Sequence, residues 1–320
     1  MAVKKEYAHL VKPMLIQDAP AGLYPEKRIW MEAKDLEGFN AHFSFGFIKK
    51  PVGPIHPLEG AIVHPYDELL VFEGTDSAGS ILKLNAEVSV ELGEEREEYI
   101  FNEPTVVLIP KGMPHGAVKV RKVKKPIVHY TFGLAPAYKA SPAKVAASIS
   151  KGKKYSKYIK KMITTVTAPP PNASGRMPQV IGKDGIMHPA KAGVGPGNGD
   201  QIVWLYGPDL EGFNINFTWG FYSQCGKWHR GGESHYHPEA EILGFVGLDP
   251  DNLDYLGAEL ELGMGKDYER HIFNKPTVVI CPDAFPHLPL ITRWVDKPYG
   301  FFVACLSGEH ASPWVETESK

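Results

Sequence analysis

Four residues in the second half of the chain are suited to hold a metal ion together. His235, His237 and Glu241 occupy alternating positions, so an extended strand would direct all three side chains to one face. A further histidine, His287, ends the sequence Pro-Asp-Ala-Phe-Pro-His, in which two prolines stiffen the turn. Imidazole nitrogens with one carboxylate oxygen are donors that suit Fe, Mn, Ni, Cu or Zn. We therefore predict a metal centre in this half.

The chemistry of such a centre depends on the positions that the protein leaves open. Four protein ligands leave one or two positions free on a five- or six-coordinate ion, and open positions are typical of a catalytic metal. Fe(II) could bind a chelating substrate with dioxygen beside it, whereas Mn, Ni or Zn could polarise a carbonyl group or stabilise an enolate. Because neutral imidazoles and one carboxylate leave a divalent ion net positive, we expect a small anionic or enolisable substrate.

Two residues that precede the histidine motif are candidates for a direct catalytic role. Arg230 could clamp a substrate carboxylate, and His229 could carry a proton. Both residue types are equally compatible with the exposed rim of a site, so a catalytic role and a solvent-exposed one both stay open for them.

The first half of the chain carries a related but smaller set of donors: His64, Glu68 and His115. The position that corresponds to His235 is Ile62, so one nitrogen ligand has been replaced by an aliphatic side chain. Three interpretations are open: a two-histidine, one-carboxylate metal site, replacement of the missing imidazole by His56 or His42, or a mainly structural domain. Neither His56 nor His42 has the spacing of the motif, and we expect weak or no metal binding in this half.

An internal repeat defines the architecture that positions these residues. The segment Asp35–Asn40 recurs unchanged as Asp209–Asn214, and Phe101–Val107 returns as 273–279 with Glu replaced by Lys. The distance between the two copies is nearly constant, so the halves differ only by small changes in loops. The chain is therefore a tandem duplication.

Each half has the sequence pattern of an all-β domain. At 39–47 and 213–221, aromatic or aliphatic residues alternate with polar or small ones, which predicts a strand with two unlike faces. We expect the aromatic face to pack in a core, and the face of Asn214, Asn216 and Thr218 is a candidate cavity lining. Short strands separated by turn signals such as Glu73-Gly74 favour a barrel or a sandwich.

The two motifs resemble those of the cupin superfamily, whose pattern is Gly-x5-His-x-His-x3-4-Glu-x6-Gly followed by Pro-x-Gly-x2-His. Gly231 or Gly232 and Gly247 fall near the flanking glycines of the first motif, and Ala284 replaces the glycine of the second. The resemblance implies a small β-barrel with one metal inside it. It implies no particular reaction, because this fold hosts many activities.

The predicted fold is therefore all-β: two jelly-roll-like cupin barrels joined by a partly helical linker. We place the first barrel with its N-terminal arm at 1–134, the linker at 135–200 and the metal-binding barrel at 201–320. Ser141-Pro142 is a candidate helix start, with serine as N-cap and proline in the first turn. We expect the arm before Trp30 and the tail after Ser307 to pack on the other half or on a partner subunit.

Composition and charge narrow the location and the partners. A formal net charge of -2 gives no general reason to expect nucleic acid or an anionic membrane as a partner. The lysines between Lys139 and Lys161 are better explained as a solvated face of the linker. The N-terminus has no apolar signal sequence, and three cysteines without a Cys-x2-Cys pair indicate reduced thiols. We expect a cytoplasmic protein, and a homodimer that covers the aromatic strand faces.

Three functions are compatible with these features, and we expect an enzyme. The first is a non-haem Fe(II) dioxygenase acting on a small aromatic or enolic organic acid, as the resemblance to double cupins of that class implies; several of those use three histidines without the glutamate, so Glu241 counts against that subgroup. The second is a Mn-, Ni- or Zn-dependent decarboxylase or isomerase. The third is a metal- or ligand-binding double cupin without turnover. Neither the substrate nor the metal follows from the sequence.

Overall fold

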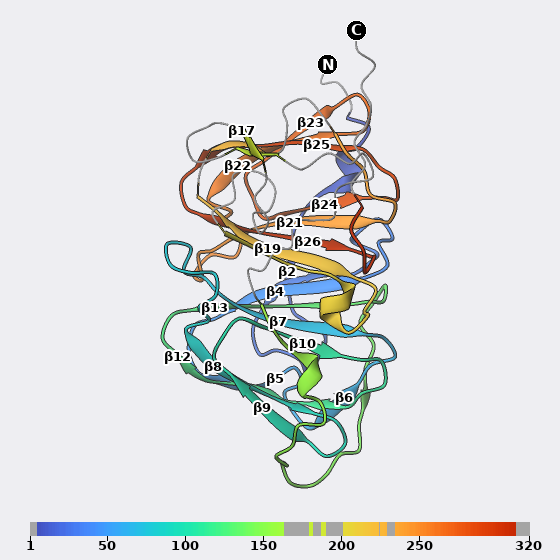
Figure 1. Cartoon of the computed structure of the whole chain (residues 1–320), viewed down its shortest axis with the longest axis vertical. Coiled ribbons are helices and arrows are strands. Elements are labelled where there is room, and N and C mark those ends of the chain that lie inside the picture. The colour runs from blue at the N-terminus through green and yellow to red at the C-terminus, as the bar shows by residue number, and fades with distance from the viewer. Residues whose placement is uncertain are drawn as a thin grey trace. The chain divides into compact units, whose positions relative to one another are not determined.

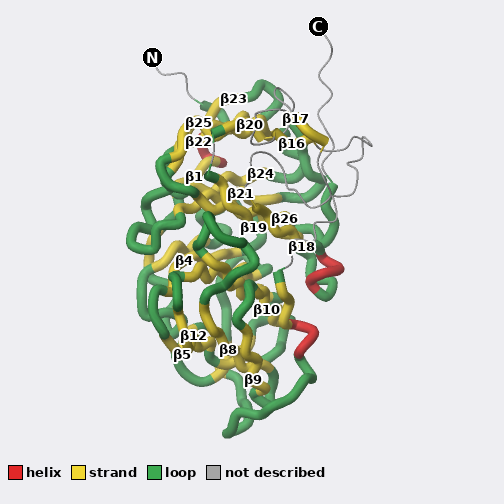
Figure 2. Tube along the Cα trace, turned by 60° about the vertical axis from the view of Figure 1, so that its left-hand side comes forward, coloured by secondary structure: helices red, strands yellow, loops and turns green. Residues whose placement is uncertain are grey.

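Strands make up nearly all the regular structure in the computed structural model of the chain (Figures 1 and 2). The residues that it describes are 5–162, 179–181, 187–189, 201–223, 225–228 and 234–311. Within them, the helices are short 3-10 turns: η1 (Ala8–Leu10), η2 (Ser156–Tyr158) and η3 (Gly207–Leu210). The all-β prediction is confirmed. No helix in these parts of the chain has the length and apolar character needed to cross a membrane.

The chain forms two compact units. The N-terminal unit comprises Met14–Met162 and Asp209–Phe213, and the C-terminal unit comprises Met1–Pro13, Ile163–Pro208 and Asn214–Lys320. These limits differ from the predicted ones at several places. The start of the N-terminal arm belongs to the C-terminal unit, whereas the first part of the predicted linker, 135–162, and the segment Asp209–Phe213 belong to the N-terminal unit.

Strand pairing explains where the N-terminal arm lies. Strand β1 (Val11–Pro13) pairs antiparallel with β24 (Thr277–Cys281), with Val11 opposite Val279. The arm therefore adds an edge strand to a sheet of the C-terminal unit. This is one of the two positions that we expected for the arm.

The predicted linker contains strands where a helix was expected to begin. Strand β14 (Ser141–Pro142) pairs with β6 (Ala61–Val63), and β15 (Ile159–Lys161) pairs with β10 (Thr105–Ile109). The predicted helix start at Ser141 is therefore wrong. An added strand supplies hydrogen-bond partners to the backbone groups at the edge of a sheet. Proline is tolerated in such an edge strand because the N–H that it lacks would face away from the sheet. The described helical part of this segment is the single turn η2.

Two sheets form the N-terminal unit. The order of the first is β15-β10-β7-β13-β4-β3-β2, and the order of the second is β14-β6-β11-β8-β12-β5 with β9 paired to β8. The strands not yet given in the first sheet are β7 (Glu68–Gly74), β13 (Ile127–Gly133), β4 (His42–Ile48), β3 (Arg28–Met31) and β2 (Ile16–Gln17). Those in the second are β11 (His115–Gly116), β8 (Ala86–Leu92), β12 (Val118–Val123), β5 (Val52–Ile55) and β9 (Glu97–Phe101).

The C-terminal unit repeats this plan. One sheet has the order β1-β24-β21-β26-β19-β18, and the other has the order β20-β25-β22-β23. The remaining strands of the first are β21 (Glu241–Gly247), β26 (Tyr299–Cys305), β19 (Asn216–Tyr222) and β18 (Gln201–Leu205). Those of the second are β20 (Gly226–Trp228), β25 (His287–Val295), β22 (Ala258–Met264) and β23 (Glu269–Phe273), and β16 (Gln179–Ile181) pairs with β17 (Met187–Pro189).

Burial and register show which strand faces point into each barrel. In the N-terminal unit, Leu70 and Phe72 of β7 pack with Val88 of the opposite sheet in one buried apolar cluster. Glu68 has the same parity as Leu70, so the carboxylate points into the same interior. In the C-terminal unit, Asn216 lies opposite Cys305, which lies opposite Glu241. Asn216 and Thr218 of β19 therefore share the interior with Glu241, as predicted for a cavity lining, whereas Asn214 precedes β19 and is exposed.

Candidate metal centres

The structure brings the four predicted residues of the C-terminal unit together. His235 Nε2 lies 3.0 Å from His287 Nε2 and 3.2 Å from His237 Nε2. Glu241 Oε1 lies 2.8 Å from His287 Nε2 and 3.3 Å from His237 Nε2. All four side chains are buried, and their ligand atoms lie within 4.8 Å of one another.

Local backbone pairing holds this group in place. His235 and His287 form a bridge through reciprocal N–H···O contacts of 3.1 and 2.9 Å, and Glu241 is the first residue of β21. In the turn before His287, the backbone N–H of Ala284 donates to the carbonyl oxygen of His237 at 2.8 Å. Ala284 has a φ of +55°, in the left-handed region that favours glycine. This explains why the cupin motif has glycine at this position.

The N-terminal unit also has a complete group of four donors. His56 Nε2 lies 3.1 Å from Glu68 Oε2, and His64 Nε2 lies 3.2 Å from the same oxygen. His64 Nε2 is also 3.1 Å from His115 Nε2. These four side chains are buried, with ligand atoms within 4.8 Å of one another. The loss of a donor at Ile62 is therefore made good by His56, which directly follows β5.

His56 lies outside the spacing of the motif, so the sequence offers it only as a possible replacement ligand. The spacing rule assumes that all first-motif ligands come from one strand. His56 instead enters from the preceding loop, which another part of the chain holds in place: the backbone N–H of His56 donates to the carbonyl oxygen of Leu23 at 2.8 Å. The expectation that this half has only three donors was wrong for this reason.

Backbone carbonyl groups fix the orientation of three of the imidazoles. His64 Nδ1 lies 2.9 Å from the oxygen of Lys139, His237 Nδ1 lies 2.7 Å from that of Ala311, and His287 Nδ1 lies 3.1 Å from that of Phe285. Because a carbonyl oxygen only accepts, each Nδ1 carries the proton. With Nδ1 carrying a proton, Nε2 of each ring faces the other donors, which is the usual arrangement of a metal-binding histidine.

The donor atoms fit a divalent cation in both units. Two Nε2 lone pairs that face each other at about 3 Å repel unless a proton or a cation lies between them. Adjacent ligands at right angles around an ion with bonds of about 2.1 Å are separated by about 3.0 Å, close to the 3.0 and 3.2 Å between the Nε2 atoms of the C-terminal group. Three histidines and one carboxylate suit a divalent transition metal.

Burial and the neighbouring charges set the protonation states of these groups. Burial alone would raise the pKa of Glu241, but His237 and His287 outweigh it and lower that pKa. At Glu68, burial raises the pKa, but His56 and His64 outweigh it and hold the pKa well below its usual value. Burial lowers the pKa of His115 to about 3. Ionised carboxylates and a neutral imidazole at neutral pH are the states that bind metal.

The two residues predicted to act in catalysis, Arg230 and His229, lie outside the described residues. The described interiors nevertheless differ between the two units. On the face that carries Glu68, the buried polar side chains of the N-terminal unit include His42 and Thr105, whose counterparts Asn216 and Thr277 are polar too, and a further four: Arg28, Ser44, His129 and Thr131. The counterparts of these four are Ile202, Thr218, Phe301 and Val303, so three of the four polar side chains are replaced by apolar ones. The interior next to the N-terminal group is therefore the more polar one.

Comparison with known proteins supports the fold. No family model and no curated protein sequence matches the chain. Among solved structures, a glutamate-to-alanine mutant of Bacillus subtilis oxalate decarboxylase aligns with a TM-score of 0.53 at 10% identity, over 95% of this chain and 78% of that one. The chain has a bicupin fold.

Two further structures of the same bacterial enzyme agree. A tryptophan-to-tyrosine variant aligns with a TM-score of 0.52 at 9% identity, over 95% of this chain and 78% of the other. A structure from work on the Mn(II) centres of that enzyme aligns with a TM-score of 0.51 at 10% identity, over 95% and 77% of the two chains. At this level of identity, the similarity shows a shared fold. The two donor sets are features of this chain's own structure.

Proposed function

We propose that the protein is a metal-dependent enzyme that decarboxylates a small organic acid without net oxidation. The observation that carries the proposal is a buried group of three histidines and one glutamate in each cupin domain, within a fold like that of oxalate decarboxylase. Because that enzyme has Mn(II) centres, Mn(II) is the metal we expect before Fe(II), Ni or Zn. Iron-dependent dioxygenation, the first hypothesis from the sequence, has no such support.

The proposed reaction balances without dioxygen as a co-substrate. The bond between the carboxylate carbon and its neighbour breaks, carbon dioxide leaves, and the neighbouring carbon gains one proton. When bound, a divalent ion supplies positive charge that polarises a substrate oxygen. The chain holds that ion with neutral imidazoles and one carboxylate, and their burial keeps bulk water away from it.

We place the reaction in the N-terminal unit, where sequence reasoning had favoured the C-terminal one. Ser44 Oγ and Thr131 Oγ1 lie 2.9 Å apart on the face of Glu68, so hydroxyl groups line this interior. His129 lies on the same face, and its Nε2 is 2.9 Å from Tyr24 Oη. These groups can donate hydrogen bonds to an anion or orient it, whereas the C-terminal counterparts of His129 and Thr131 are Phe301 and Val303.

Metal content and product analysis test the proposal together. We expect protein purified without chelator to contain manganese, measured by inductively coupled plasma mass spectrometry. The manganese-loaded protein should release carbon dioxide from oxalate or another small carboxylate, while an oxygen electrode records no stoichiometric oxygen uptake. Oxygen uptake equal to substrate consumption would instead identify a dioxygenase, and bound metal without turnover of any small acid would identify a binding protein.

Two matched variants assign the metal and the activity to one barrel. His64→Ala and His235→Ala each remove one imidazole from one group. We expect each to lose metal from its own unit, and we expect His64→Ala to lower kcat further than His235→Ala. The reverse order of the two kcat values would return the reaction to the C-terminal unit.

A further inference from the structure

A cavity of about 280 Å³ in the N-terminal unit is lined by basic residues and by none of the four metal-site donors. Its basic residues are Lys27, Arg28, Lys49 and Lys50, and its acidic residue is Glu26. Val52 and Ile55 contribute apolar surface. A cavity with this composition suits an anion that also has an apolar part.

The buried member of the basic group, Arg28, has no carboxylate partner. Arg28 is only 5% exposed. No carboxylate of the described residues lies within ion-pair distance of its guanidinium. One guanidinium nitrogen donates to the carbonyl oxygen of His129 at 2.6 Å, whereas the buried Nε has no hydrogen-bond partner. A buried charge without a counter-ion is costly, and a small anion would supply one.

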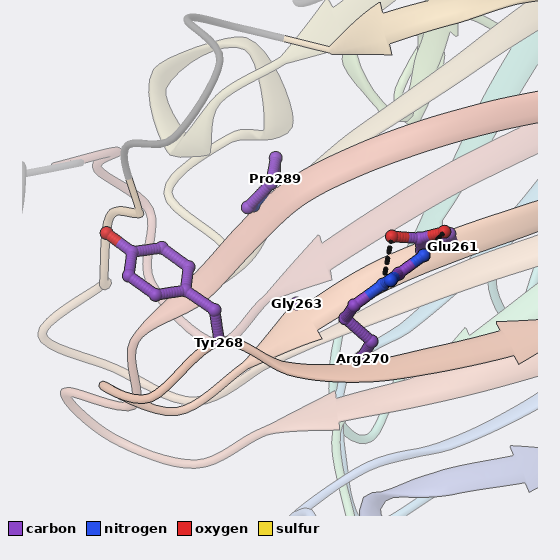
Figure 3. A pocket seen from close by; sticks show the side chains of 5 residues that line it. All are labelled: Glu261, Gly263, Tyr268, Arg270 and Pro289. Carbon is purple, nitrogen blue, oxygen red and sulfur yellow. Dashed lines mark hydrogen bonds and ion pairs between the residues drawn. The ribbon is translucent and has the colours of Figure 1, made fainter.

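Another arginine beside a pocket shows the contrasting arrangement. Arg270 lines a cavity of about 220 Å³ in the C-terminal unit together with Glu261. Figure 3 shows the guanidinium directed at that carboxylate; Nε and Nη2 of Arg270 donate to its two oxygens at 2.6 and 2.7 Å. The charge of Arg270 is therefore already neutralised within the protein, whereas that of Arg28 is not.

The neighbours of Arg28 hold its guanidinium in one orientation. Cζ of Arg28 lies 3.8 Å from the ring centroid of Tyr24. On the strand next to it, a Cβ added at Gly46 would lie 3.3 Å from Arg28 Cβ and 3.5 Å from its Cζ. A side chain at position 46 would thus press on Cβ of Arg28 and touch its guanidinium in ordinary van der Waals contact. A planar fork held this way suits a carboxylate or a phosphate.

We propose that this cavity binds a small organic anion, with its carboxylate or phosphate head on Arg28 and its apolar part on Val52 and Ile55. The arginine is not repeated among the described residues of the C-terminal barrel, where the counterpart of Arg28 is Ile202. The cavity adjoins the N-terminal metal-binding group through Tyr24, whose ring centroid lies 5.4 Å from that of His56. The inference concerns binding and holds whether or not the protein is a decarboxylase.

The experiment is isothermal titration calorimetry with benzoate, phenyl phosphate and the neutral analogue benzamide. Each is titrated into manganese-loaded protein and into protein depleted of metal with a chelator. We expect either anion to bind in both preparations, and we expect benzamide to bind at least about tenfold more weakly. Comparing benzoate with phenyl phosphate distinguishes the two head groups.

Two variants test the role of Arg28 in different ways. Arg28→Met removes the charge and keeps the length of the side chain, while Gly46→Ala keeps Arg28 and presses on its Cβ. We expect Arg28→Met to weaken anion binding at least about tenfold and Gly46→Ala to weaken it less, with cooperative thermal unfolding retained in both. Arg121→Met is the matched control, because Arg121 of the same barrel is paired with Glu98, and it should leave the affinity unchanged.

Several results would overturn the inference. They are anion binding that requires the metal, equal affinity for benzamide, the same affinity in Arg28→Met as in the original protein, and no binding of either anion at millimolar concentration. The first would move the anion to the metal centre, and the second would describe an apolar pocket.

Discussion

The Nε2 atom of His56 lies 3.1 Å from the Oε2 atom of Glu68, in the barrel whose first motif lacks one histidine. This contact completes a second group of donors and makes the two barrels alike in ligand type, although one ligand comes from a different place in the chain. A duplicated domain can thus lose a ligand from its motif and keep the donor set, because neighbouring loops reach the same interior.

Replacement of His56 tests whether it is a metal ligand. We expect His56→Ala to weaken metal binding in the N-terminal unit by at least about 100-fold, since even residues that only orient ligands are worth about 10- to 100-fold. His42→Ala is the control, because His42 is the other histidine that the sequence offered; its Nδ1 donates to the carbonyl oxygen of Ala135 at 2.8 Å. Equal metal content in His56→Ala and the original protein, measured by mass spectrometry, would refute the assignment.

The N-terminal arm should stabilise the turn that carries His287. The rings of Tyr7 and Phe285 meet edge to face with centroids 5.1 Å apart. We expect Tyr7→Ala to lower the free energy of unfolding by about 1 kcal/mol, as for other aromatic pairs, and to weaken metal binding in the C-terminal unit more than in the N-terminal one. His9→Ala, at an exposed position of the same arm, is the control. Calorimetry that finds the two variants equally stable would argue against this role of the arm.

Backbone conformation predicts a stabilising change in the same turn. Ala284 has a positive φ, which costs an L-residue with a Cβ atom about 1 kcal/mol relative to glycine. We expect Ala284→Gly to raise the free energy of unfolding by about 0.5–1 kcal/mol, the larger flexibility of glycine in the unfolded chain offsetting part of the gain. Urea denaturation measures the difference, and a destabilised variant would contradict the explanation.

Acid should weaken the ion pair between Glu261 and Arg270. The hydrogen bonds from Arg270 lower the pKa of Glu261. A carboxyl group whose pKa is lower in the folded state stabilises the folded protein at pH values above the ordinary pKa near 4.5. This contribution is lost as the pH falls through the folded-state pKa. Because the Arg270 side chain is 67% exposed, we expect the ion pair to contribute less than about 1 kcal/mol to the free energy of unfolding.

Unfolding in urea between pH 7 and pH 3 checks this prediction. Glu261→Gln should reduce the loss of stability on acidification relative to the original protein. An unchanged dependence on pH in the variant would show that other carboxyl groups account for the whole effect.

The sequence by itself determined the repeat, the all-β class and the C-terminal donor set. These features depend on local order: the spacing of His235, His237 and Glu241 marks the donor set, although 236–240 form no strand in the structure and His235 is held by an isolated bridge to His287, and identical segments in the two halves must adopt the same fold. The position of the arm on a sheet of the C-terminal unit was one of two options, and sequence reasoning had no means of choosing between them.

Tertiary structure alone decided the role of His56, the strand at Ser141 and the unpaired charge of Arg28. Each depends on residues far away in the chain: Leu23 holds the backbone of His56, an available sheet edge outweighs the helix-start preference of Ser141-Pro142, and packing leaves Arg28 without a carboxylate partner among the described residues. Such contacts leave no regular spacing in the sequence, because packing in three dimensions is what brings their partners together.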